Sequence, residues 1–266
     1  KISSFWLGLM IDSDNQLLER MNWFWHGHWA TSYQKVDEPY VMLKQLLTMR
    51  NFSLGNYSDF ASAMIVDGAL IYWLDGQLNT IKAPNENLSR EMMELFTLGV
   101  NRYTEDDVKQ SAKVLTGYKV VKSSGLVTFS PELHYSLPIK FLNTNQSFDG
   151  PSLARFLVTR DDCATFIAER IWFRFINDAT PLLDNSIQNS FSDRDILKAI
   201  TSAARHQGMR DENNSLVRPP LEWFISACRA LNVTPSKLGN QNQAQNYLDR
   251  LSQKPFYPPN VGGWPS

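Results

Sequence analysis

The sequence predicts a mainly α protein, a compact multi-helix domain with one small β-hairpin. Apolar residues recur at three- and four-residue steps over most of the chain, as in Leu17, Met21 and Phe24, with His28 at the next step. This spacing is typical of amphipathic helices. Alternating β-branched residues are confined to one short stretch. Of the 266 residues, 43% are hydrophobic, which is enough for a large core.

Start and stop signals place the individual helices. Thr104 and Asp107 have the spacing of a capping box, and Gly117 suits the residue that follows the helix. Asn56 or Ser58, Asn87, and a box from Ser192 to Asp195 mark other starts, and Pro219 with Pro220 opens the last helix. The expected helices cover about 14–30, 39–49, a segment through Phe60 to Ile65, 87–99, 104–117, 150–159, 162–176, a segment after Asp195 to about Gln207, and 220–231.

The β-hairpin is expected at 118–121 and 126–129, around Ser-Ser-Gly. Residues 131–150 read as an irregular polar connection. We expect one globular domain over 1–266, with possible lobes 1–130 and 150–266 on either side of this connection. Because the chain starts without methionine and stops abruptly, we expect it to be part of a longer protein.

Charge and composition exclude several classes of protein. The formal net charge is −1, and lysine and arginine are dispersed along the sequence, so no electrostatic case exists for nucleic acid. The longest apolar stretch is interrupted by Asp67 and Gly68, so no membrane span is expected. Cys163 and Cys228 are the only cysteines. Two buried thiols are favoured over a single bridge.

The segment from Pro84 to Gly99 concentrates polar groups next to an apolar run. Glu91 and Glu94 lie one helical turn apart beside methionines, so at least one carboxylate should point inward, at a cost unless it is paired. A structural alternative is a Glu91 that stabilises the helix dipole and a Glu94 bridged to Arg90 or Arg170. The neighbouring Asn85, Glu86 and Asn87 are read most simply as turn and capping residues, although they would also suit the mouth of a pocket.

The histidines provide candidate ligands. His26 and His28 lie two positions apart, so on a helix they point to opposite sides and cannot share an ion. We expect His28 to face inward and His26 to lie at the rim. His134, in the irregular connection, is a possible third partner for His28 and the glutamates, whereas His206 is explained by a helix end.

Four tryptophans lie near the start of the sequence, and several standard catalytic and nucleotide-binding motifs are absent. Trp6, Trp23, Trp25 and Trp29 would suit a sugar-stacking platform, but core packing is favoured because two of them follow the helical stripe. The sequence has no G-x-S-x-G elbow, Walker loop, G-x-G-x-x-G or H-E-x-x-H motif.

Several motifs resemble a bacterial family, domain of unknown function 1800. They are M-N-W-F-W-H-G-H-W-A-T-S at 21–32, L-G-N-Y-S-D-F at 54–60, A-P-N-E-N-L-S-R-E-M-M-E-L-F-T-L-G-V at 83–100, Y-T-E-D-D-V at 103–108, L-T-G-Y at 115–118, C-A-T-F-I-A-E-R-I-W at 163–172 and P-P-N-V-G-G-W-P at 258–265. The family has no established reaction. The resemblance implies export to the periplasm or the exterior, and a neighbouring protein of the domain of unknown function 1501 family as partner. Many relatives have histidine where this chain has Phe96, and an acid where it has Tyr135.

Two main functional hypotheses follow. In the first, the protein is a metal-dependent enzyme resembling a hydrolase, with His28, Glu91, Glu94 and His134 as ligands of zinc, manganese or iron and His26 or Glu86 as acid or base. In the second, it is a non-catalytic helical scaffold or assembly partner, whose polar residues form a buried hydrogen-bond network. Carbohydrate binding through the tryptophans is a third option.

Overall fold

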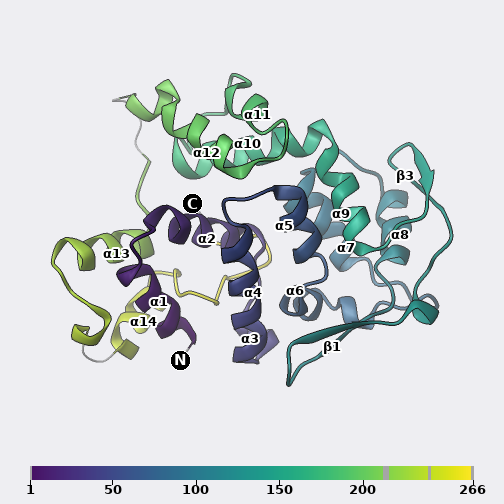
Figure 1. The fold of residues 1–266 in the computed structure, drawn as a ribbon, viewed down its shortest axis with the longest axis horizontal. Coiled ribbons are helices and arrows are strands. Elements are labelled where there is room, and N and C mark those ends of the chain that lie inside the picture. The colour runs from purple at the N-terminus through teal and green to yellow at the C-terminus, as the bar shows by residue number, and fades with distance from the viewer. Residues whose placement is uncertain (1, 212–215, 239–240, 265–266) are drawn as a thin grey trace.

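The computed structural model describes residues 2–211, 216–238 and 241–264. Within these ranges the chain forms fourteen α-helices and two small antiparallel sheets of two strands each (Figure 1), which confirms the mainly α class. The helices are α1 (Ile2–Asp12), α2 (Gln16–His28), α3 (Tyr33–Val36), α4 (Pro39–Phe52), α5 (Tyr57–Met64), α6 (Gly68–Trp73), α7 (Asn87–Glu91), α8 (Glu105–Val114), α9 (Gly150–Thr159), α10 (Asp161–Phe175), α11 (Ser186–Ser190), α12 (Ile196–Arg205), α13 (Pro220–Ala230) and α14 (Gln241–Arg250).

Local capping chemistry explains most helix starts. Thr104 and Asp107 form the predicted capping box at the start of α8, and Asn56 caps α5 by accepting from the backbone N–H of Ser58. At the start of α12, Asp195 is the cap and accepts from the backbone N–H of Lys198, so Ser192 is not the capping residue of the predicted box. The prediction for Asn87 is wrong, because Asn87 is the first residue of α7 and its N–H donates to the side chain of Asn85.

The helix that follows Asn87 is not regular. It continues beyond α7 as a π-helical turn, Met92–Thr97, before Gly99 ends it with a φ of +86°. Gly99 is required at this position, since any side chain there would be strained and would press on the ring of Phe166. Short π-helical turns interrupt the usual side-chain spacing, which the sequence pattern did not reveal.

The two sheets are both hairpins. The first pairs β1 (Tyr118–Val121) with β2 (Leu126–Phe129), as predicted. The second pairs β3 (Ile139–Phe141) with β4 (Thr144–Gln146) inside the connection that was predicted to be irregular. Its turn places Leu142 and Asn143 at positive φ. Leucine is not a usual turn residue, which explains why this hairpin was not predicted.

Two clusters of buried apolar side chains stabilise the fold. The larger joins one side of α2 to α5, α7–α10 and α12. The smaller joins the other side of α2 to α1, α13 and the C-terminal segment, residues 251–264. In Figure 1, α1, α13 and α14 lie together at one end, the hairpins and α8 lie at the other, and α2 and α4 lie between them. Both clusters contain residues from before and after 131–150, and α2, α4 and α6 contribute residues to both.

The structure bears on the predictions for the tryptophans, the cysteines and membrane spans. Trp6, Trp25 and Trp29 have no exposed surface, which confirms core packing. Cys163 and Cys228 are both buried and free, so no bridge joins them. Among the described helices, none has the length and the hydropathy that a membrane crossing requires.

Candidate functional site

His28 lies in the larger core cluster at the end of α2. Its Nε2 is 2.9 Å from the hydroxyl oxygen of Tyr57 and 3.1 Å from the carbonyl oxygen of Phe96. Because the Tyr57 hydroxyl donates to that same carbonyl at 2.6 Å, Nε2 carries the hydrogen. Nδ1 is buried and has no partner among the described residues. Burial, aided by the charge of Arg170, lowers the pKa of His28 to about 3.

His26 occupies the opposite side of α2, in the smaller cluster. It is 1% exposed, so its predicted place at the rim is wrong. The ring packs against Trp6 and Phe256, and Nε2 accepts a hydrogen bond of 3.2 Å from the backbone N–H of Phe256. Burial lowers the pKa of His26 to about 3. This neutral histidine therefore anchors the C-terminal segment to α2.

Glu91 of α7 and Glu94 of the π-helical turn are both half-buried. Glu91 has a raised pKa because of burial and the nearby charge of Glu94. Glu94 accepts a hydrogen bond of 2.5 Å from the Tyr103 hydroxyl, so the predicted bridge to Arg90 or Arg170 is not what the structure shows. Arg90 instead pairs with Glu105 and Glu86.

His134 follows the first hairpin and is held by backbone groups. Its ring nitrogens lie 3.3 Å from the carbonyl oxygen of Thr116 and 3.2 Å from that of Phe148. The structure does not gather His28, Glu91, Glu94 and His134 into one ligand set: the described residues contain no group of three or more His, Cys, Asp or Glu side chains that could hold a metal. Their assignment as ligands stays a prediction.

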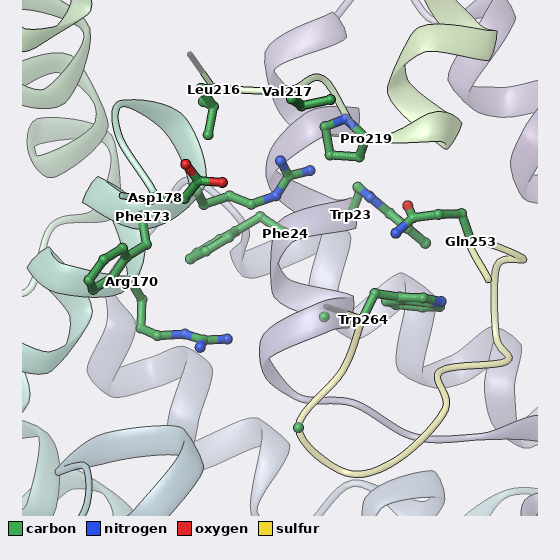
Figure 2. A pocket seen from close by; sticks show the side chains of 13 residues that line it. Trp23, Phe24, Arg170, Phe173, Asp178, Leu216, Val217, Pro219, Gln253 and Trp264 are labelled. Atoms are coloured by element: carbon green, nitrogen blue, oxygen red, sulfur yellow. The ribbon is translucent and has the colours of Figure 1, made fainter. Parts of the chain in front are cut away.

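A cavity of about 250 Å³ lies where α2, α10 and the C-terminal segment meet (Figure 2). Trp23, Phe24 and Gly27 of α2 line one wall, and Arg170, Phe173 and Arg174 of α10 line another. The remaining lining residues are Asp178, Leu216, Val217, Pro219, Gln253, Gly262 and Trp264. The cavity thus lies at the junction of the two core clusters, which is a common location for ligand sites.

Arg170 is the unusual residue of this cavity. Figure 2 shows its side chain extending from α10 below the ring of Phe24. Burial lowers the pKa of its guanidinium, and none of the described acids forms an ion pair with it. A largely buried positive charge without a carboxylate partner is costly to the fold, so a site for an anion is indicated.

Aromatic and amide groups complete the walls. The rings of Trp23 and Trp264 lie 4.2 Å apart between centroids, tilted by 35°. Gln253 is 6% exposed, and its Oε1, like Nε1 of Trp264, has no hydrogen-bond partner in the described part of the chain. Since a rotated amide exchanges its oxygen and nitrogen, Gln253 can offer the cavity either a donor or an acceptor.

A close backbone contact holds Trp264 in place. Gly263 has a φ of +85°, and a Cβ at this position would overlap the carbonyl oxygen of Gly27 in α2. Only glycine combines this left-handed conformation with so close an approach. The two consecutive glycines before Trp264 are a sequence signal of such an approach, but the sequence does not reveal what the chain approaches.

Replacing Gly263 with alanine should therefore damage both the fold and the cavity. We expect a loss of roughly 2 kcal/mol or more in the free energy of unfolding, from backbone strain and overlap. Urea denaturation of Gly263→Ala measures this loss, with Gly262→Ala as the matched control because Gly262 has no positive φ and its Cβ would meet only the side chain of Asn260. Equal losses in the two variants would contradict the interpretation.

The described structure therefore defines a mainly α protein with an arginine-containing cavity between two core clusters. The sequence profile described as "Protein of unknown function (DUF1800)" matches residues 1–266, and the chain belongs to this family. No curated protein and no solved structure matches it. The family membership confirms the resemblance found in the motifs and assigns no reaction.

Proposed function

We propose that this protein binds an acidic sugar in the cavity between α2 and α10. The observation that carries the proposal is Arg170, a largely buried guanidinium that lines the cavity and has no ion pair with a described acid. An anionic ligand would supply the missing charge. Guanidinium groups hold carboxylates, sulfates and phosphates through two parallel hydrogen bonds, so the ligand's acidic group is expected against Arg170.

The other walls favour a ring compound over a bare inorganic anion. Trp23, Phe24 and Trp264 present aromatic surface, which suits the apolar face of a sugar ring. Gln253 provides an amide whose oxygen the described protein leaves unpaired, so it can accept a hydrogen bond from a hydroxyl group. A sugar that carries a carboxylate or a sulfate has an acidic group for Arg170, an apolar ring face for the aromatic side chains and hydroxyl groups for Gln253.

The cavity supports binding better than catalysis. Its described lining contains no histidine, cysteine or serine, and Asp178, the one acid in it, is exposed. The histidines that the sequence singled out lie in the core, where their hydrogen bonds connect α2 to Tyr57, Phe96 and Phe256. These contacts support the non-catalytic alternative, in which buried polar groups fix the packing of the helices.

Arg170→Gln tests the proposal. In saturation-transfer NMR, D-galacturonate and galactose 6-sulfate should bind the native protein, whereas neutral D-galactose should not. The variant should lose at least tenfold in affinity for the acidic sugars, because a hydrogen-bonded charge pair contributes about 1.5–3 kcal/mol. Its free energy of unfolding should be unchanged or higher, since an unpaired buried charge is removed.

The matched control is Arg155→Gln, at an exposed position on α9, which should leave binding intact. Binding of the neutral sugar with the same affinity, or full binding by the Arg170 variant, would contradict the proposal. So would an absence of binding to both acidic sugars.

A metal-dependent activity at Glu91 and Glu94 is the second candidate. It is favoured by one observation: the charge of Glu94 contributes to the raised pKa of Glu91, so the two carboxylates lie near each other. Zinc sites in proteins take three or four protein ligands. In this chain the 96 position, which is histidine in many relatives, is a phenyl ring 6.1 Å from the ring centre of His28. Elemental analysis of protein purified without chelator tests this candidate. A near-stoichiometric transition metal would support it, and metal-free protein would contradict it.

We also propose the location and partner that the family resemblance implies. Export to the periplasm or the exterior would place the protein where acidic polysaccharides of cell surfaces occur. A protein of the domain of unknown function 1501 family stays the expected partner.

A further inference from the structure

A second cavity, of about 390 Å³, lies next to the first. It is bounded by α1, α2 and α13, and Met10, Leu221 and Ile225 form its apolar floor. Trp23 lines both cavities, and Pro219 of the first is the chain neighbour of Arg218 in the second. The two cavities are therefore adjacent, and Trp23 of α2 is their common wall.

One ion-pair bridge joins the walls of the two cavities. Glu222 of α13 holds Arg20 through Oε2 at 3.0 Å and Arg174 through Oε1. Arg174 belongs to the first cavity, whereas Arg20 and Glu222 belong to the second. One carboxylate thus neutralises only one of two guanidinium groups, and the bridge keeps a net positive charge at the junction.

Arginine dominates the charge of the combined walls. Five arginines and three acids line the two cavities, and no lysine does. The arginines are Arg20, Arg170, Arg174, Arg218 and Arg229.

Of the acids, Glu19 is already paired with Arg50, outside the cavities. Arg229 donates to the backbone carbonyls of Ile11 and Ser13, which do not neutralise its charge. Because the whole chain has a net charge of −1, this positive region is local. Tertiary structure has gathered arginines that are dispersed in the sequence.

We infer that the two cavities form one elongated site whose ligand is an acidic oligosaccharide with at least two charged sugar units. The inference rests on the proposed function, since the first unit lies against Arg170. Arg218 and Arg229 of the second cavity are exposed and form no ion pair with a described acid, so they can bind an acidic group that a single sugar at Arg170 does not carry. The apolar floor there suits a second ring, and Arg218 and Arg229 suit its acidic group.

Chain length of the ligand provides the test. Affinities of the protein for D-galacturonate and for tetragalacturonate are measured by isothermal titration calorimetry, with maltotetraose as the neutral tetramer and tetraglutamate as the acidic peptide. The acidic tetramer should bind at least tenfold more tightly than the monomer. Arg218→Gln should lower tetramer affinity about tenfold and leave monomer affinity unchanged, whereas Arg170→Gln should weaken both.

Each outcome separates the two proposals. If monomer and tetramer bind equally, and only Arg170→Gln matters, the elongated site is wrong while the proposed function stands. If neither sugar binds, both fail. Tighter binding of tetraglutamate than of tetragalacturonate would overturn the inference in favour of an acidic peptide, and equal binding of maltotetraose would show that charge plays no part.

Discussion

Acidification from pH 7.5 to pH 4 should lower the free energy of unfolding by about 4 kcal/mol. His26 and His28 are neutral and buried, each with a pKa lowered to about 3 from an ordinary value of 6.5. Their contribution to stability is fully present above pH 6.5 and is lost as the pH falls toward 3, because the unfolded chain binds the protons first. At about 1.4 kcal/mol per pH unit, each histidine costs roughly 3 kcal/mol at pH 4.

Asp67 opposes this loss. It is buried, accepts hydrogen bonds from the N–H of Leu70 and from Gln45, and has a pKa raised by burial to about 6. A raised carboxyl pKa favours folding below the ordinary value of 3.8, and the advantage disappears as the pH rises through 6. Between pH 6 and pH 4 the folded protein therefore regains roughly 2–3 kcal/mol.

Urea denaturation at half-unit pH steps measures the balance. Asp67→Asn keeps a capping side chain and removes the opposing titration, so its stability should fall more steeply with acid than that of the native protein.

Protonation of His26 also removes the acceptor for the Phe256 N–H, which releases the segment that carries Gln253 and Trp264. Ligand binding should therefore be lost before or together with unfolding. A stability that is constant between pH 7.5 and 4.5 would contradict these assignments.

Trp25→Ala should cost about 3–5 kcal/mol in the free energy of unfolding. The Trp25 indole has no exposed surface, stacks with Tyr57 at 5.2 Å and meets Phe60 edge-on at 5.3 Å. Its Nε1–H donates to the carbonyl of Ser53 at 3.0 Å. Truncation leaves a large cavity and an unpaired carbonyl, and both effects destabilise the fold.

The chain offers a matched control for this truncation. Trp223 of α13 is 63% exposed, so Trp223→Ala should change the free energy of unfolding by no more than about 0.5 kcal/mol. Urea titration followed by far-UV circular dichroism measures both variants. Similar losses would show that burial of Trp25 does not carry the expected energy. If Trp25→Ala fails to fold, Trp25→Phe provides the smaller cut, with most of the apolar volume kept.

The sequence predicted local structure well where a capping signal and a periodic stripe agreed. Thr104 and Asp107, the first hairpin and the starts of α9 and α13 were all placed correctly, because each depends on residues within one or two turns. The second hairpin was missed because its turn uses Leu142 at positive φ. The π-helical turn was missed because its sequence looks like an ordinary amphipathic helix.

The candidate site was predicted less well. Residue chemistry drew attention to His26, His28 and the glutamates, yet the two histidines are buried in different core clusters. Arg170 appeared in the sequence only as a possible partner for Glu94. Nothing in its spacing showed that α2, α10 and the C-terminal segment would enclose it. Trp264 and its two glycines were visible as a motif, but their contact with Gly27 depends on residues more than 230 positions away.

The sequence by itself determined the helical class, the family, the buried tryptophans and the opposite directions of His26 and His28, because periodicity and capping act over short distances along the chain. Only the tertiary structure decided which charges lack a partner and which surfaces enclose a cavity. The physical reason is that burial and ion pairing depend on segments that are far apart in sequence. Dispersed arginines thus became a positive site where α2, α10 and α13 meet.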